Sequence, residues 1–434
     1  MELKKYKLAD IAKIEISGVD KKTIEGETPV RLCNFVDVYY NWAITKEKAK
    51  SFMVASAKQT EIDKCSIGKG MVAITKDSET RDDIGVATYI ADDFEYVLLG
   101  YHCALITPNP AIVDGKYLNA FMHTRYIQKY FENNASGSGQ RYTLSNDTIG
   151  NIPVLIPSIE EQRTIGKVLA DIDCKIELNK LINDNLEEMA KQLYDYWFVQ
   201  FDFPNEEGKP YKSSGGTMVW NEKLKRKIPQ GWSNGILSDV ANITMGQSPD
   251  GSSYNEDGEG IIFYQGSTDF GLRFPDIRQY TTSPSRYANK GDILMSVRAP
   301  VGALNIANND CCIGRGLSAL SSKIGSMTHL YYLMNDFRLK FEGMNSAGTT
   351  FGSITKNELF SLPVIIPTKS VISEFEQVCE PIFYKQMIIG EEINALTKQR
   401  DELLPLLMNG QASVNYHLSV LVSPYYIIYR DQYK

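Results

Sequence analysis

The chain has 434 residues, 43% hydrophobic and 23% charged, a composition typical of a soluble globular protein with room for two or three domains. Its 46 lysines and arginines face 53 aspartates and glutamates, and this net charge of −7 argues against a protein that grips nucleic acid alone. Neither a membrane-length apolar run nor a signal-peptide core is present, so we expect a cytoplasmic protein with no membrane partner.

The common catalytic motifs are missing. The seven cysteines form no C-x-x-C pair, the four histidines form no H-E-x-x-H motif, and no phosphate-binding G-x-x-x-x-G-K-[ST] loop occurs. The histidines are better explained as structural residues. We therefore expect a chain that is non-catalytic by itself and binds no metal and no cofactor.

Residues 1–157 form the first predicted domain. Short apolar runs such as 97–99 alternate irregularly with a helical stretch near 117–132, which favours an α+β domain over regular βαβ units. The domain ends in a proline-bounded strand, Asn-Ile-Pro-Val-Leu-Ile-Pro, at 151–157.

A long helix is predicted over 158–200, because apolar residues recur there in alternating steps of four and three, the pattern of a coiled-coil seam. Asn179 and Asn183 are polar exceptions at seam positions. The aromatic residues at its end, from Tyr194 to Phe203, have two interpretations: core packing against the next domain, which we favour, or a docking surface for another subunit. The apolar seam residues of this helix are Ile165, Leu169, Ile172, Ile176, Leu186 and Leu193.

The organisation then repeats. A linker at 201–231, rich in turn residues, leads to a second α+β domain at 232–367. Its last strand, Ser-Leu-Pro-Val-Ile-Ile-Pro at 361–367, lies 210 positions after the first proline-bounded strand. Other matches lie at offsets up to 229, so the two domains are related and differ by loop insertions.

A second long helix at 368–412 keeps the same seam register, with Gln386 and Arg400 as polar exceptions. Such polar residues either fix the register of two paired helices or face solvent where the helices splay. Two helices with narrow apolar stripes most simply pair with each other as an antiparallel coiled coil. The tail 413–434 is left unassigned. The apolar seam residues here are Phe375, Ile382, Ile389, Ile393, Leu396 and Leu403.

The order domain, long helix, domain, long helix resembles the DNA-specificity (S) subunit of type I restriction–modification systems. Further points of resemblance lie at the two helix ends, 194–204 and 400–405, and in Val-Arg-Ala-Pro-Val-Gly at 297–302. The resemblance covers roughly residues 6–412. It implies an α+β fold in which two globular target-recognition domains are separated by two long spacer helices.

The resemblance also implies partners and a function. The chain is expected to read a bipartite, asymmetric target on double-stranded DNA and to direct methylation and cleavage by other subunits. Those partners are methylation (M) subunits, expected to be two, and restriction (R) subunits. S-adenosylmethionine, ATP and Mg are expected on the partners. From Ile165 to Trp197 the first spacer measures roughly 50 Å at 1.5 Å per residue, enough to place two domains on grooves one to one-and-a-half DNA turns apart.

Candidate DNA contacts follow from the side chains that usually read bases, namely arginine for guanine and asparagine or glutamine for adenine. Two small-residue loops at matching places in the repeat provide the primary candidates, although tight turns would explain these loops equally well. For Arg298 a structural role bridging loops is the favoured alternative, and Phe351 stands where the repeat has Arg141. The primary candidates are Ser136, Ser138, Gln140, Arg141, Tyr142, Ser346, Thr349 and Thr350, and the secondary ones are Lys76, Arg81, Gln265, Arg298 and Arg315.

Three alternatives remain open. In the first, the chain is the specificity component of a related bipartite restriction system. In the second, it is a coiled-coil scaffold that never touches DNA, and in the third, it is a specificity chain fused to its own enzyme. The length leaves no spare domain for the last. A gel-shift assay with the methylation subunits present separates a DNA reader from a scaffold.

Overall fold

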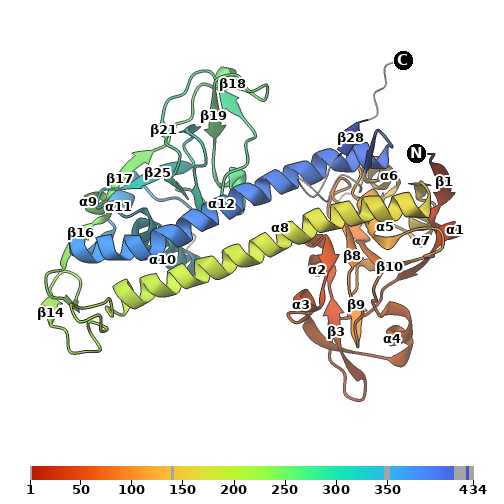
Figure 1. Cartoon of the computed structure of the whole chain (residues 1–434), viewed down its shortest axis with the longest axis horizontal. Coiled ribbons are helices and arrows are strands. Elements are labelled where there is room, and N and C mark those ends of the chain that lie inside the picture. The colour runs from red at the N-terminus through yellow and green to blue at the C-terminus, as the bar shows by residue number, and fades with distance from the viewer. Residues whose placement is uncertain (1, 138–140, 347–351, 415–426, 430–434) are drawn as a thin grey trace. The chain divides into compact units, whose positions relative to one another are not determined.

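The computed structural model describes residues 2–137, 141–346, 352–414 and 427–429, so the candidates Ser138, Gln140, Thr349 and Thr350 lie outside the described residues. The chain divides into two compact units (Figure 1). Unit 1 comprises Met1–Glu177 and Ala395–Lys434, and unit 2 comprises Leu178–Asn394. Each unit therefore contains one mixed helix-and-sheet domain and a part of each long helix.

The domain of unit 1 is built on a five-stranded sheet in the order β2-β10-β6-β8-β4, beside a three-stranded sheet β5-β3-β9. Strands such as β6 are buried throughout and carry the core, which explains their unbroken apolar sequence. The predicted helical stretch near 117–132 is two helices, interrupted at His123 and Thr124. The strands are β1 (Lys4–Lys7), β2 (Ala12–Ile16), β3 (Thr28–Cys33), β4 (Ala43–Ile44), β5 (Met53–Ala57), β6 (Val72–Thr75), β7 (Asp77–Ser78), β8 (Ala87–Ile90), β9 (Val97–Leu99), β10 (Cys103–Pro108), β11 (Ser136–Gly137), β12 (Tyr142–Thr143) and β13 (Pro153–Ile156), and the helices are α1 (Leu8–Ile11), α2 (Phe35–Tyr39), α3 (Lys46–Ala49), α4 (Gln59–Cys65), α5 (Gly115–Met122), α6 (Arg125–Asn134) and α7 (Asn146–Gly150).

The domain of unit 2 has a four-stranded sheet β17-β25-β22-β23 and a five-stranded sheet β18-β20-β19-β24-β21. Before it, the segment predicted as a linker contains a hairpin of β14 and β15. The strands are β14 (Met218–Asn221), β15 (Arg226–Pro229), β16 (Ser233–Ile236), β17 (Ala241–Met245), β18 (Tyr254–Asn255), β19 (Ile261–Tyr264), β20 (Tyr280–Thr281), β21 (Tyr287–Ala288), β22 (Ile293–Ser296), β23 (Leu304–Ile306), β24 (Cys311–Ile313), β25 (Leu317–Ser322) and β26 (Pro363–Ile366), the helices are α9 (Leu237–Val240), α10 (Met327–Ser346) and α11 (Lys356–Phe360), and 3₁₀ turns occur at Gly251–Ser253 and Ser267–Asp269.

The two domains share one strand register. In β1 and β13, Lys4 lies opposite Ile156, and in β16 and β26, Ser233 lies opposite Ile366. Ser233 follows Lys4 by 229 positions and Ile366 follows Ile156 by 210, the two offsets read from the sequence. The parallel strand pair β3·β9 of unit 1 also corresponds, strand for strand, to the parallel pair β19·β24 of unit 2. The sequence repeat is therefore also a structural repeat, in which the framework strands of the two units correspond residue by residue.

Both long helices run without interruption (Figure 1). Helix α8 (Ile159–Tyr194) starts where the Ser158 hydroxyl accepts a hydrogen bond from the Glu161 amide at 3.3 Å, which is a capping arrangement. It ends in a π-helical turn, Asp195–Val199. Helix α12 (Lys369–Met408) is followed by β27 (Ala412–Val414), which pairs with β28 (Ile427–Tyr429).

The polar seam residues Asn179, Asn183 and Gln386 are buried, Arg400 is half-buried, and most of the four have partners. In unit 2, Asn179 donates to Glu392 at 2.9 Å and Gln386 donates to Glu187 at 2.8 Å, and these pairs run in opposite directions along the helices. In unit 1, Arg400 lies 3.5 Å from Asp173. The two helices are therefore antiparallel, and the alternative in which these polar residues face solvent is wrong. The predicted apolar seam residues are all buried or half-buried, namely Ile165, Leu169, Ile172, Ile176, Leu186, Leu193, Phe375, Ile382, Ile389, Ile393, Leu396 and Leu403.

The aromatic residues after α8 form a core of unit 2, as the favoured interpretation predicted. Phe198 and Trp197 pack on Phe375 of α12 with ring centroids 4.8 and 5.5 Å apart, and Phe203 stacks on Trp232 at 5.1 Å. Linker and second domain are thus joined to the helix pair by a continuous apolar cluster.

Candidate functional site

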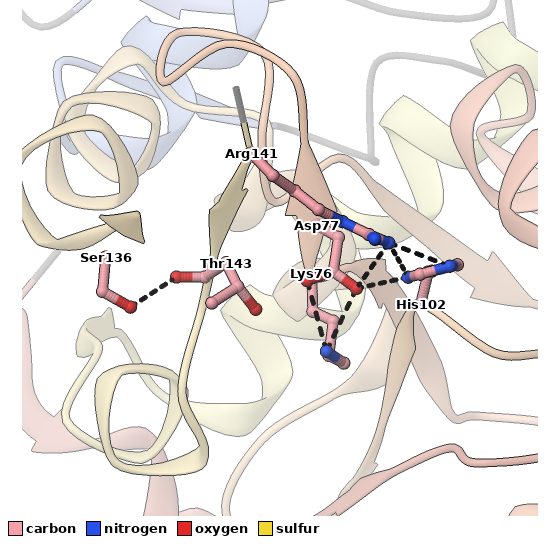
Figure 2. Close-up of polar contacts among 6 residues, drawn as sticks. All are labelled: Lys76, Asp77, His102, Ser136, Arg141 and Thr143. Atoms are coloured by element: carbon pink, nitrogen blue, oxygen red, sulfur yellow. Dashed lines mark hydrogen bonds and ion pairs between the residues drawn. The ribbon is translucent and has the colours of Figure 1, made fainter. Parts of the chain in front are cut away.

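A network of charged side chains lies at the end of β6 in unit 1 (Figure 2). Lys76 and Asp77 follow the buried strand, and β7 pairs with β12 so that Thr143 lies opposite Asp77. Asp77 Oδ2 is 3.1 Å from Lys76 Nζ and 2.5 Å from His102 Nδ1. Arg141 Nη2 lies 2.7 Å from the same His102 Nδ1 and 3.0 Å from His102 Nε2. Arg141 is thus held against a His–Asp pair, while its side chain remains 62% exposed.

The network is anchored by Asp77, whose side chain is only 11% exposed. Burial by itself raises the pKa of Asp77, but hydrogen bonds from Thr143, His102 and Lys76 outweigh it, so the pKa is lowered from its ordinary value. His102 enters the network because it has a left-handed backbone conformation, φ 72°, just before β10. The carboxylate therefore remains charged and positions the imidazole and the guanidinium.

A hollow opens beside this network. Its walls come from α2, from the segment after β7 and from the turn before β10, and its polar groups include Asp77, His102 and Arg141. The Tyr39 hydroxyl donates to Asp83 at 2.8 Å on the opposite wall, and this contact raises the pKa of Tyr39 to about 12. The hollow of unit 1 is therefore aromatic and acidic, with one accessible guanidinium.

Unit 2 has a hollow in the equivalent place. It is lined by Gln265, Arg298 and Arg315 together with small residues such as Ser248 and Ser296. All three long side chains are exposed, and no acidic side chain among the described residues pairs with either arginine. Three of the secondary candidates chosen from sequence are therefore brought together on one polar concave surface.

The two hollows correspond through the repeat. The chain enters each from the parallel strand pair, where the Gly100 amide donates to Cys33 in unit 1 and the Gly314 amide donates to Tyr264 in unit 2. The framework therefore matches while the lining residues differ, and the register sets the equivalent positions as Asn34 and Gln265, Asp77 and Arg298, Tyr101 and Arg315, and His102 and Gly316.

The other candidates have different environments. Lys76 is largely buried against Asp77, so its charge is already paired. Tyr142 is half-buried, and the Arg81 guanidinium lies 5.0 Å from its ring centroid. Ser136 donates to the Thr143 carbonyl at 3.2 Å, because β11 and β12 pair in antiparallel fashion with Ser136 opposite Thr143.

The structure changes the interpretation of Arg298, His102 and Asp77. Arg298 bridges loops through its backbone, which pairs with Ser353, and among the described residues its guanidinium has no hydrogen-bond partner. His102, expected to be only structural, and Asp77 were missed as members of the site. The position of Asp77 directly after a buried strand was the available signal, since strand ends commonly hold polar site residues. Ser346 is the last residue of α10.

Within the described part of the chain, no group of three or more histidine, cysteine, aspartate or glutamate side chains is arranged to hold a metal ion. Among the same residues, no helix is long and apolar enough to cross a membrane.

The chain belongs to the family described as the type I restriction modification DNA specificity domain, whose model matches residues 1–188 and 229–399, one match for each repeat. A Methanocaldococcus jannaschii protein provisionally named the type I restriction enzyme MjaX specificity subunit is 29% identical over 371 residues, covering 83% of each chain. The HindI specificity subunit of Haemophilus influenzae is 23% identical over 399 residues, covering 77% of this chain and 85% of that one.

Among solved structures, the S subunit of a type I restriction–modification system from M. genitalium superimposes with a TM-score of 0.57 at 15% identity. The match covers 94% of this chain and 96% of that one. At this identity the likeness shows a shared fold, two domains with long helices between them.

Proposed function

We propose that this chain is the DNA-recognition subunit of a type I restriction–modification complex and reads a bipartite, asymmetric target. The observation that carries the proposal is the pair of equivalent hollows, which share a framework but present different side chains. A common framework suits two domains that approach the same DNA backbone, and different hollows suit two domains that read different bases.

The chain is a non-catalytic component in this proposal. Two methylation subunits supply S-adenosylmethionine-dependent methylation, and restriction subunits supply ATP- and Mg-dependent cleavage. The net charge of −7 supports this division of labour, because a DNA reader that is negatively charged overall needs partner subunits to close around the duplex. Specific affinity is therefore expected to be weak until the methylation subunits join.

A surface for such a partner is available on α8. Large apolar side chains are exposed along it, including Leu178, Leu181 and Met189, each at least half exposed. Single exposed leucines are ordinary on a protein surface, but several on one helix are typical of an interaction site. We assign this face to a methylation subunit.

Domain exchange tests the proposal. Replacing residues 1–157 with the corresponding segment of another family member should change one half of the methylated target and leave the other half unchanged. Methylation-sensitive sequencing of cells that carry the complete system reports both halves directly. If the two domains do not read separate half-sites, both halves of the target would change. If the chain is a scaffold that never touches DNA, no methylated motif would be found.

A further inference from the structure

One position in the two hollows carries opposite charge. Asp77 follows β6 in unit 1 and lies opposite Thr143, while Arg298 follows β22 in unit 2 and lies opposite Ser353. The strand pairings on both sides of this position are the same in the two units. The backbone frame is therefore constant, and only the side chain has changed from a carboxylate to a guanidinium.

This inversion separates contacts to the DNA backbone from contacts to bases. The phosphate backbone is the same anion in both halves of a target, so a contact to it needs a donor in both domains. Tyr101 and Arg315 occupy equivalent exposed positions and are both donors, which is compatible with such a shared contact. Asp77 and Arg298 cannot both contact phosphate, because the carboxylate would be repelled.

The surroundings of Arg298 suit base reading. Its backbone is fixed by the bridge to Ser353 and by the Ser296 hydroxyl, which donates to the Arg298 carbonyl at 2.6 Å. Its guanidinium is exposed on the polar hollow, beside Gln265 and Arg315, and has no acidic partner among the described residues. A fixed backbone that carries an accessible, planar guanidinium is the arrangement that binds guanine O6 and N7 with two hydrogen bonds.

We propose that Arg298 reads a guanine in the half-site bound by unit 2, and that Arg315 contacts a phosphate beside it. In unit 1 the equivalent Asp77 faces inward and positions His102 and Arg141, so that half-site is read by different groups. This inference rests on the proposed function and adds to it the identity of one base and of the residue that selects it.

The test uses the full chain assembled with its methylation subunits. Binding to the methylome-derived target and to single-base variants of it is measured over a range of salt for Arg298→Gln, Arg298→Lys and Arg315→Gln. Arg278→Gln is the matched control, because Arg278 is exposed in the same unit but does not line the hollow.

Arg298→Gln should lower discrimination at one guanine of one half-site by about 5- to 140-fold, the equivalent of one bidentate contact. Arg298→Lys should keep the charge and retain only part of the discrimination, because an ammonium group can donate to guanine O6 and N7 but lacks the planar fork. Arg315→Gln should weaken all sequences alike and reduce the slope of log affinity against log salt by about one. The control should resemble the wild-type chain.

Two results would overturn the inference and leave the proposed function standing. One is a uniform loss with a reduced salt slope for Arg298→Gln, which identifies a phosphate contact. The other is a target whose unit 2 half-site contains no guanine on either strand. A wild-type complex that methylates no sequence motif would instead refute the proposed function, and the inference with it.

Discussion

Arg273 joins the domain of unit 2 to both long helices, and its removal gives a sharp test of how that domain is held. Its side chain is 8% exposed. Nη1 lies 3.1 Å from Glu187 of α8, and Nη2 lies 3.0 Å from the Gln386 side-chain oxygen of α12. The guanidinium also lies 5.0 Å from the Phe383 ring centroid. We consider the substitution Arg273→Ala.

The expected loss follows from these contacts. Breaking a buried ion pair from one side costs about 3–5 kcal/mol, because the remaining charge is left without compensation. Glu187 is 32% exposed and keeps its hydrogen bond from Gln386, so the lower end applies, and the lost cation–π contact adds about 0.5–2 kcal/mol. We expect the free energy of unfolding of unit 2 to fall by about 3.5–5 kcal/mol.

Urea unfolding followed by tryptophan fluorescence measures this change, since Trp197 and Trp232 lie in the aromatic core of unit 2. Arg338→Ala is the matched control. Arg338 pairs with Glu342 one helical turn away and both are more exposed, so its loss should cost below about 1 kcal/mol. If Arg273→Ala destabilised the chain no more than Arg338→Ala, the network would not be what holds the domain to the helices.

Two further predictions concern packing and pH. A Cβ at Gly390 of α12 would lie 2.7 Å from the buried Phe274 ring. Gly390→Ala should therefore destabilise unit 2 by about 1–3 kcal/mol, although alanine has the better helix propensity. In the same urea experiment, Asn394→Ala at an exposed position of this helix should be neutral or stabilising. Burial lowers the pKa of His329 to about 3, so as pH falls below 6.5 the unfolded chain binds a proton that the folded chain does not. Between pH 6 and 4 the stability of the wild-type chain should therefore fall more steeply than that of His329→Phe, by up to about 1.4 kcal/mol per pH unit. Equal slopes would show that His329 is protonated in the folded state.

The architecture was predictable because it depends on patterns that are local in the sequence. Seam residues such as Ile172 and Phe375 recur at fixed steps, and the two proline-bounded strands mark the ends of the domains. Even the polar exceptions were found at the right positions. Only their partners, such as Glu392 for Asn179, required the structure, because those residues lie more than 200 positions apart.

The site was less predictable, because it depends on strand pairing. Asp77 and His102 lie 25 positions apart and meet only because β6 pairs with β10. Gln265, Arg298 and Arg315 could be selected by residue type, but their convergence on one hollow depends on three different loops. The equivalence of Asp77 with Arg298 was hidden by loop insertions and emerges from the register alone.

The division of the chain has a consequence for its synthesis. Unit 1 takes its last part from residues after Ala395, and the 217 residues of unit 2 are made in between. At about 5–20 residues per second, roughly 10–40 s pass before Arg400 can reach Asp173, which is 4% exposed in the folded chain, and the Trp42 ring. During translation the first domain therefore keeps one face of its helix uncovered until the segment that follows unit 2 has been made.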